Sequence, residues 1–261
     1  MSFPEVPSLL PVPFRTLLYR EVHRFFIVIN QTLLAPVISA LLYLFIFGFS
    51  LGDRFGSFHG YNYLLFLVPG LVMMGLVNNS FQNPSSSLMI SKFEGNIVDI
   101  LMAPIGHGEI ILGYMLGGMF RGLLVGTCIL VVSCLFAIPP FSHPFYLVAV
   151  ALLSSGLFSL LGIVAGIWAE KFDDLAMFPT FIITPLTYLG GVFYSISILP
   201  PLWRTVSLLN PLLYMINALR FGFLGVSDVN PGWSLAALAI LDAALFGICL
   251  TMLRTGYRLR K

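Results

Sequence analysis

Two charged residues lie inside long apolar runs of the sequence, and they are the first candidates for chemistry. Counted from one end of its run, each of Arg121 and Asp242 would lie roughly 17 to 18 Å into a helix that rises about 1.5 Å per residue. If these runs cross a membrane, either charge alone costs at least about 2.5 kcal/mol. We expect an ion pair between them or a wet cavity facing each. The simpler interpretation is that Arg121 meets other polar groups and Asp242 is protonated or near water.

Patterns for catalysis or metal binding do not accompany these charges. A phosphate loop, G-x-x-x-x-G-K-[ST], needs a lysine after a glycine, and none of Lys92, Lys171 and Lys261 has that context. An intramembrane aspartyl protease needs two facing aspartates, whereas only Asp242 stands in the middle of a run. The histidines at 23, 59, 107 and 143 fall at run ends or in loops, and the cysteines at 128, 134 and 249 fall in apolar runs. We expect no catalytic residue and no metal site in this chain.

The composition is that of a membrane protein. Of 261 residues, 58% are hydrophobic and only 9% are charged, whereas soluble domains carry about 25% charged residues. The mean hydropathy is +0.97. A net charge of +2 without a basic tract argues against nucleic acid as a partner. The first fourteen residues contain four prolines and no apolar segment typical of a cleavable signal peptide, so we expect the first run to persist in the mature protein.

Six apolar runs are long enough to cross a bilayer, which takes about 20 residues. They cover residues 26–51, 61–81, 109–138, 144–169, 175–198 and 233–253. The segment 199–230 is also apolar, but it is too rich in Pro, Gly and Asn for an ordinary span. The expected fold class is therefore an all-α polytopic membrane protein with six transmembrane helices.

Basic residues indicate the orientation of these spans. If the N-terminus is inside, the inner segments hold nine Lys and Arg residues and the outer segments hold three. The inner set is Arg15, Arg20, Arg24, Lys92, Lys171, Arg254, Arg258, Arg260 and Lys261, and the outer set is Arg54, Arg204 and Arg220. The positive-inside rule then places both termini in the cytoplasm.

The segment before the first run is amphipathic, which predicts an interfacial helix over 14–25. Ordinary flanking charge explains its basic residues equally well. The apolar face is Phe14, Leu18, Val22 and Phe25, and the basic face is Arg20, His23 and Arg24.

Glycine and proline punctuate several runs. Glycines four residues apart, at 113, 117, 118, 122 and 126 and again at 162 and 166, favour close helix packing. We expect that packing within one subunit, with a dimer interface as the alternative. Pro69–Gly70 interrupts the second run, and Pro179, Pro185 and Gly190–Gly191 interrupt the fifth.

Broken membrane helices are tolerated where their backbone is buried or lines a cavity. Polar side chains near the breaks therefore predict a translocation path between the second and fifth spans and their symmetry mates. The alternative is that these groups satisfy each other in a packed bundle. The path residues are Asn78, Asn79, Thr184, Thr187, Tyr188 and Tyr194.

The stretch SKFEGNIVDILMAP, residues 91–104, lies in the long connection 84–108. Read as one helix that Pro104 ends, it is apolar on one face and polar on the other. It is either an interfacial helix on lipid or a lever that docks into a partner subunit. In the second case Phe93 or Ile97 is the apolar anchor, and Glu94 or Asp99 meets a basic rim.

The segment 188–225 resembles the C-terminal signature of the ABC transporter type-2 permease family. The matching residues are Gly190, Gly191, Phe193, Leu199, Pro200, Asn210, Pro211, Tyr214, Leu219 and Arg220. The pair Arg20–Glu21, the pair Pro69–Gly70 and the stretch EGNIVDILMAP also match. The resemblance covers nearly the whole chain and is strongest to the bacterial branch of YadH-like permeases and nodulation-factor exporters.

This resemblance implies a half-size permease of the bacterial inner membrane, with one type-2 transmembrane domain over 1–261 that works as a homodimer. Two copies of a separate ATP-binding subunit would dock beneath it and hold ATP and Mg²⁺, so this chain would be a transport subunit without a cofactor, not an enzyme. Residues 199–230 would form re-entrant helices on the outer side, and 84–108 would hold a coupling helix. The residues expected to couple to the ATPase are Phe93, Glu94, Ile97, Asp99, Leu101, Arg20 and Glu21.

Three functions remain open at this point. The first is the permease subunit of an ATP-driven exporter for an amphipathic or lipid-linked substrate, such as a lipid, glycolipid, lipo-oligosaccharide or drug. The second is an ion-coupled secondary transporter, which would need intramembrane acids, yet Asp242 stands alone. The third is a scaffold or receptor that uses the connection 84–108 to bind a partner. Co-purification of an ATPase subunit distinguishes the first from the others.

Overall fold

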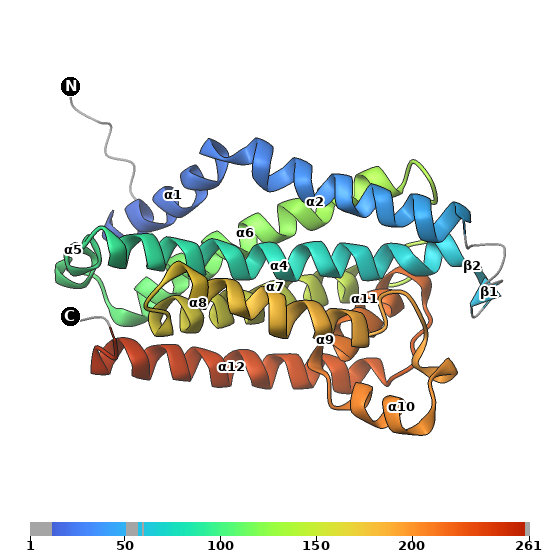
Figure 1. The fold of residues 1–261 in the computed structure, drawn as a ribbon. Coiled ribbons are helices and arrows are strands. Elements are labelled where there is room, and N and C mark those ends of the chain that lie inside the picture. Colours follow the sequence, from blue (N-terminus) through green and yellow to red (C-terminus); the bar gives the residue numbers. More distant parts are fainter. Residues whose placement is uncertain (1–11, 51–56, 59, 259–261) are drawn as a thin grey trace.

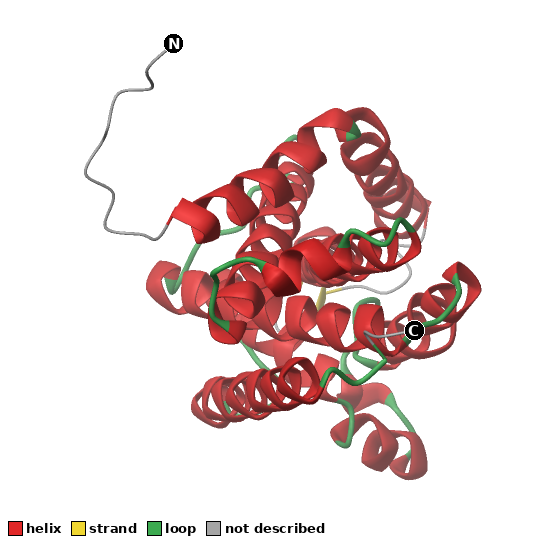
Figure 2. Cartoon of the chain, turned by 90° about the vertical axis from the view of Figure 1, so that its left-hand side faces the viewer, coloured by secondary structure: helices red, strands yellow, loops and turns green. Residues whose placement is uncertain are grey.

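The computed structural model describes residues 12–50, 57–58 and 60–258, and nearly all of them are helical (Figure 2). A short β-hairpin with two residues in each strand, in which Phe58 pairs with Tyr61, lies between the first helices and the long central one. In chain order the elements are α1 (Val12–Ile27), α2 (Ile29–Tyr43), η1 (Leu44–Ser50), β1 (Ser57–Phe58), β2 (Tyr61–Asn62), α4 (Tyr63–Phe93), α5 (Ile97–Met102), α6 (His107–Ser133), α7 (Pro144–Trp168), α8 (Phe172–Met177), η2 (Phe178–Ile183), α9 (Thr184–Leu189), η3 (Ile196–Ile198), α10 (Pro201–Leu208), α11 (Pro211–Leu224) and α12 (Pro231–Thr255).

The helices run between two ends of an elongated bundle (Figure 1). One end carries α5 and the last turn of α12, and the other carries α10 and the β-hairpin. We call these the α5 end and the α10 end. Within the described residues, α4, α6, α7 and α12 are long and apolar enough to cross a membrane, and α1 with α2 forms a fifth candidate bent by 59°. The all-α, multi-pass prediction is confirmed, while the count of six spans stays a prediction.

Helix α4 corrects the predicted second span. The prediction ended it at Phe81 and broke it at Pro69–Gly70, but α4 runs without interruption from Tyr63 to Phe93. A proline inside a helix removes one hydrogen bond, and here neighbouring elements enclose most of α4 and hold it together. Gly70 does not break the helix. It allows close packing, because a Cβ added there would lie 2.9 Å from the carbonyl oxygen of Val192.

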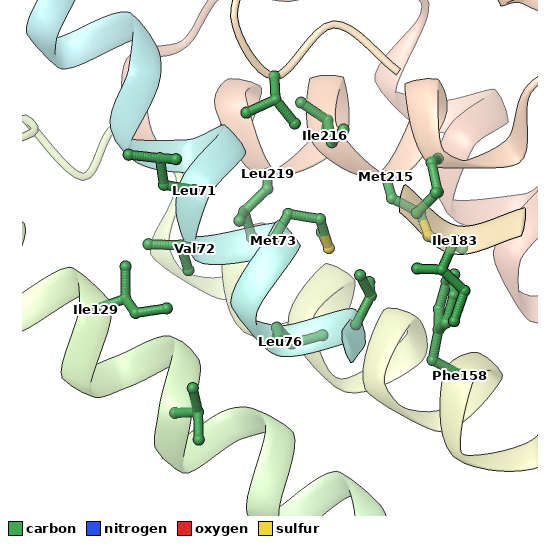
Figure 3. Packing of buried hydrophobic residues seen from close by; sticks show 14 of the residues in the cluster. Leu71, Val72, Met73, Leu76, Ile129, Phe158, Ile183, Met215, Ile216 and Leu219 are labelled. Atoms are coloured by element: carbon green, nitrogen blue, oxygen red, sulfur yellow. The ribbon is translucent and has the colours of Figure 1, made fainter. Parts of the chain in front are cut away.

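The core is built around α4. This helix packs against α6 and α7, and its N-terminal part, at Phe66, also contacts Arg220 of α11. Figure 3 shows the interdigitation, with Leu71, Met73 and Leu76 of α4 among side chains from α6, α7 and α11. Helix α4 is therefore the axis against which the other segments are placed.

Glycines bring α6 and α7 close to α4 within one subunit, as the four-residue spacing predicts. A Cβ at Gly122 would lie 1.8 Å from the Oγ of Ser80, and one at Gly162 would lie 2.4 Å from the carbonyl oxygen of Phe81. The intrasubunit interpretation is confirmed at these positions. No side chain larger than hydrogen fits them without moving a helix.

Helix α1 shows why the predicted amphipathic face needs correction. Its buried residues are Phe14, Leu17, Glu21 and Phe25, so the inward face is turned toward Leu17 and Glu21 rather than Leu18 and Val22. The helix over 14–25 exists and extends slightly further at both ends. A buried carboxylate on the inner face is a contact that a hydrophobic pattern alone cannot reveal.

The first and fifth predicted spans are not single straight α-helices. The first consists of α2 followed by the π-helical turn η1, and its predicted end, Leu51, lies outside the described residues. The fifth is α8, the π-helical η2 and α9, which stops at the turn Gly190–Gly191. Gly191 has a φ of +81°, a conformation that glycine adopts without a Cβ penalty. The predicted glycine break is confirmed there.

Candidate functional site

A cavity of about 660 Å³ lies between the α1–α2 bend, α4, α6 and the start of α9. One part of its wall is polar and includes two arginines, and the other part is mostly apolar. The lining residues are Arg24, Val28, Thr32, Ala35, Pro36, Ser39, Ala40, Tyr43, Leu71, Met74, Gly75, Asn78, Asn79, Gln82, Ser86, Arg121, Ile129 and Thr184. Exposed residues such as Gln82 and Ser39 are part of this wall, so the cavity opens to the surface.

Three of the predicted path residues, Asn78, Asn79 and Thr184, line this cavity. Tyr188 adjoins it, because its hydroxyl lies 3.3 Å from the hydroxyl of Tyr43, another lining residue. The structure does not bring the other two into the wall. Thr187 is buried and donates to the carbonyl oxygen of Ile183, and Tyr194 follows the Gly190–Gly191 turn.

Arg121 does not pair with Asp242. Its Nε donates to Oδ1 of Asn79 at 3.3 Å, and its Nη2 donates to Oε1 of Gln82 at 3.0 Å. Asp242 faces the other side of the bundle, with one carboxylate oxygen 3.2 Å from where a Cβ on Gly156 would lie. The two residues lie at matching depths along their helices, but their side chains point to different sides of the bundle. The predicted ion pair is therefore wrong. The two alternatives for Arg121, a cavity and other polar groups, both hold.

Asp242 has no hydrogen-bond partner for either carboxylate oxygen among the described residues. It lies on α12 where that helix meets α7, next to Gly156. A buried carboxyl without a donor is costly in its charged form. The protonated alternative stated for this residue therefore agrees with its surroundings.

Arg20 and Glu21 form a cluster that fastens α1 to α4 and α6. Glu21 is fully buried and accepts from Nη2 of Arg20 at 3.1 Å, from Oγ of Ser87 at 2.7 Å and from Nδ2 of Asn83 at 3.4 Å. Arg20 also donates to the hydroxyl of Tyr114 at 2.9 Å. Glu21 therefore offers no surface to another subunit, and any part it has in coupling passes through its contacts with α4.

The stretch 91–104 is not one helix, which corrects the prediction. Helix α4 ends at Phe93, Gly95 takes a φ of +80°, and a separate α5 begins at Ile97. A left-handed glycine just after a helix lets the chain turn while its N–H bonds back to the last turn, here to the carbonyl oxygen of Lys92. The residue before Pro104 is extended, so the predicted stop there is confirmed.

Four of the exposed apolar side chains at the α5 end form what we call the α5-end patch: Phe93, Val98, Met102 and Phe172. Phe93 and Met102 are 77% and 80% exposed, and the rings of Phe93 and Phe172 are in contact. Exposed Glu94 and Asp99 border the patch. Ile97 is buried inside the protein instead, and Leu101 is partly buried, so of the two proposed anchors only Phe93 remains available to a partner.

Nearby, Asp174 adds a carboxylate at the start of α8. Backbone N–H groups of Glu170 and Lys171 donate to it at 2.9 and 3.0 Å. These bonds favour its charged form and hold the pKa of Asp174 below its ordinary value. The α5 end is thus apolar at its centre, with carboxylates and the exposed Lys171 at its border.

Lys92 holds the segment 84–108 against the C-terminal end of α7 by hydrogen bonds. Its Nζ donates to the carbonyl oxygens of Gly166, Ile167 and Ala169, at 3.4, 2.8 and 2.5 Å. The last carbonyls of a helix lack intrahelical partners and attract a cation. Lys92 therefore stabilises the corner where α4 turns into α5.

We expect Lys92→Met to loosen this corner and to cost about 1–3 kcal/mol, since it removes charge-assisted hydrogen bonds to buried carbonyls. The apparent melting temperature of the purified protein in a neutral detergent should fall by several degrees. The exposed Lys171 provides the matched control, and Lys171→Met should leave the melting temperature unchanged. Equal melting temperatures for the two variants would contradict this role of Lys92.

The C-terminal signature residues organise the α10 end. Asn210 caps α11 by accepting from the N–H of Leu212 at 3.0 Å, and Pro211 occupies the first helical position. Pro200 immediately precedes α10. The carbonyl oxygen of Leu208, at the end of α10, accepts a hydrogen bond from the hydroxyl of Tyr214 at 2.9 Å. The two short helices expected in 199–230 are present as α10 and α11.

Arg220 is the most enclosed cation of this region, with 1% of its surface exposed. Its Nη2 donates to the carbonyl oxygen of Gly191 at 2.9 Å, and its Nη1 donates to Oδ1 of Asn217 at 3.3 Å. Its guanidinium carbon lies 3.7 Å from the centre of the Phe66 ring. One side chain thus joins α11, the Gly190–Gly191 turn and α4.

Sequence reasoning missed Arg24, Ser86, Thr32 and Ser39 as members of the cavity wall. The sequence pattern places Arg24 on the basic face of an interfacial helix. In the structure its Nη2 instead donates to Oγ of Ser86 at 2.5 Å, in the cavity wall. The available signal was a run of polar residues, 78–87, too long for a bare turn. That run predicts a buried polar surface once it is assigned to a helix.

Comparisons with known proteins match most of this chain. The family model of the ABC-2 type transporter matches residues 13–224, which include the cavity, the α5-end patch and the signature residues. The chain is 44% identical over 250 residues to the inner membrane transport permease YadH of Escherichia coli strain K12, covering 95% of this chain and 97% of that protein. It is 25% identical over 224 residues to Nodulation protein J of Neorhizobium galegae, covering 85% and 86%.

Proposed function

The chain belongs to the ABC-2 type transporter family, and from that premise we propose that it is the membrane-spanning permease subunit of an ATP-driven exporter. The observation that carries the proposal is the cavity between the α1–α2 bend and α4, because it gathers predicted path residues from separate segments. The substrate is amphipathic or lipid-linked, and it leaves from the cytoplasm or the inner leaflet. ATP and Mg²⁺ bind to a separate subunit.

In this proposal the chain crosses the membrane six times. Helix α2 with η1 supplies the first span, and α8, η2 and α9 together supply the fifth. Helices α10 and α11 are the re-entrant pair, and two copies of the chain form the transmembrane part. The α5 end faces the cytoplasm, since it carries more of the basic residues among the described segments than the α10 end, where Arg204 is exposed and Arg220 is buried.

The transport proposal is tested in proteoliposomes that contain this chain together with its ATP-binding subunit. ATP-dependent movement of a labelled amphiphile between leaflets or into the lumen supports it. Absence of movement with every amphiphile class, although ATP is hydrolysed, would overturn it. Movement driven by an ion gradient without the ATP-binding subunit would favour the alternative, an ion-coupled secondary transporter, for which the unpartnered Asp242 is the supporting observation.

Coupling to the ATP-binding subunit is proposed to occur through the α5-end patch. Apolar side chains at the centre with charges around them match the usual pattern of an energetic centre and a polar rim. Phe93 is the main anchor because it is 77% exposed and rests on Phe172. Glu94 and Asp99 then meet basic groups of the partner.

We expect the double substitution Phe93→Glu with Met102→Glu to weaken co-purification of the ATP-binding subunit at least tenfold, which corresponds to about 1.4 kcal/mol or more. Glu94→Lys with Asp99→Lys should weaken it less and in a salt-dependent way. Leu209→Glu is the matched control, because Leu209 is 82% exposed at the α10 end. If association and transport survive both double substitutions, the α5-end patch is not the docking site.

A further inference from the structure

The cavity has a polar region whose two cations meet no acidic residue in the wall. Among its described lining residues there are two arginines, three side-chain amides and several hydroxyls, but no carboxylate. The nearest acid along α1, Glu21, also attracts Arg24 electrostatically, but it is already balanced by the charge of Arg20 and accepts its hydrogen bonds from Arg20, Asn83 and Ser87. Arg24 and Arg121 therefore leave excess positive charge facing the cavity.

The hydrogen bonds of these arginines leave donors available. A guanidinium carries five N–H donors in a planar fork. Within the described residues, Arg121 donates two hydrogen bonds to neutral amides and Arg24 donates one to Ser86. Arginine forks match the oxygen atoms of phosphate and carboxylate groups. A buried cation without a counterion is costly, and an anion in the cavity would lower that cost.

The rest of the wall is suited to an apolar chain. Leu71, Ala40 and Ile129 line the side nearer the α10 end, together with the hydroxyl-bearing Ser39, Tyr43 and Thr184. From Leu71 to Ser86 the cavity follows α4 for fifteen residues, or roughly 22 Å at about 1.5 Å per residue. Its volume is within the range of about 300–1,000 Å³ for small-molecule sites. The wall therefore changes from cationic to uncharged and largely apolar along the length of an elongated ligand.

We propose that this cavity binds an amphiphile with an anionic phosphate or carboxylate head, placing the head between Arg24 and Arg121 and the tail toward Leu71 and Ile129. The amides of Asn79 and Gln82 orient Arg121, and Ser86 orients Arg24. The inference deepens the proposed function by naming the substrate class, and it rests on that function for transport. Binding itself requires neither ATP nor the partner subunit.

The test measures binding to the purified full-length chain in a neutral detergent. The probes are dioleoyl phosphatidic acid, oleate, dioleoylglycerol and inorganic phosphate. We expect the two anionic amphiphiles to bind at least tenfold more tightly than dioleoylglycerol, which has a tail without charge, and than phosphate, which has charge without a tail. Equal binding of dioleoylglycerol, or tighter binding of free phosphate, would overturn the proposal.

The variants locate the binding. Arg24→Gln with Arg121→Gln should weaken phosphatidic acid binding at least tenfold, whereas Arg204→Gln with Arg254→Gln, at exposed positions, should leave it unchanged. If the first double variant does not fold, Ala35→Trp is decisive, because it fills the cavity and keeps both charges. Undiminished binding in Ala35→Trp or in the folded double variant would overturn the proposal.

The outcome separates binding from transport. Binding that depends on Arg24 and Arg121 without ATP-dependent movement would leave this inference standing and remove the exporter function. Movement of amphiphiles that is equally fast in Arg24→Gln with Arg121→Gln would keep the exporter and overturn the inference.

Discussion

The substitution Arg220→Met is expected to destabilise the protein more than any other single change considered for the α10 end. Methionine fills much of the same space but leaves the carbonyl oxygen of Gly191 without its donor, while Oδ1 of Asn217 keeps only the backbone N–H of Asp228. Each buried acceptor left unpaired costs about 1–3 kcal/mol, and a desolvated cation–π contact adds about 2 kcal/mol. We expect a total loss of about 3–5 kcal/mol, seen as a much lower apparent melting temperature and a low yield of monodisperse protein.

Two further variants make this result specific. Arg220→Lys keeps the charge but not the fork, so it should lie between the wild type and Arg220→Met. Arg204→Met removes an exposed arginine on α10 and should melt like the wild type. If Arg220→Met and Arg204→Met have the same apparent melting temperature, the contacts of Arg220 do not hold the α10 end in place.

Gly162→Ala is expected to be the most damaging single methyl addition. The new Cβ would lie 2.4 Å from the carbonyl oxygen of Phe81 and 2.9 Å from Cγ of Pro84, and neither neighbour is a flexible side chain. Helices α7 and α4 must separate, at a cost of at least about 2 kcal/mol, since overpacking a core costs about 1–3 kcal/mol or more. The measurement is again thermal melting in neutral detergent.

The matched control for this change is Gly247→Ala on α12. A Cβ there meets nothing within 4 Å, and alanine is favoured over glycine inside a helix by about 0.5–1 kcal/mol. The same chemical change should therefore destabilise at Gly162 and slightly stabilise at Gly247. A shift of the same sign at both positions would refute the close α4–α7 contact.

The helices that the sequence predicted well are those with unbroken apolar runs. The fourth predicted span, 144–169, became α7 (Pro144–Trp168), and the sixth, 233–253, became α12 (Pro231–Thr255). Helix α4 was predicted too short because residues 78–87 are polar. In the fold these side chains bond to their own helix, as Asn79 does to the carbonyl oxygen of Gly75, and to Glu21 of α1.

The candidate site was predictable in part. Asn78, Asn79 and Thr184 are predicted as path residues because they are polar side chains near the expected breaks of the second and fifth runs, although α4 is in fact unbroken at Pro69–Gly70. The contribution of α1 and α2 could not be found this way, since the bond between Arg24 and Ser86 joins residues 62 positions apart. The pairing of Arg121 with Asp242 failed for a related reason. Depth along a helix can be read from the sequence, but the direction a side chain faces depends on packing.

The buried Glu21 has a consequence for how the chain is made. Its partner Ser87 lies 66 residues later, so at about 5–20 residues per second a ribosome produces the carboxylate roughly 3–13 s before the hydroxyl. During that interval a charged Glu21 cannot enter the acyl layer without a large cost. We therefore expect the nascent α1 to stay outside the acyl layer while the following segments insert. Its docking is therefore a late step of biogenesis, taken only when α4 has arrived.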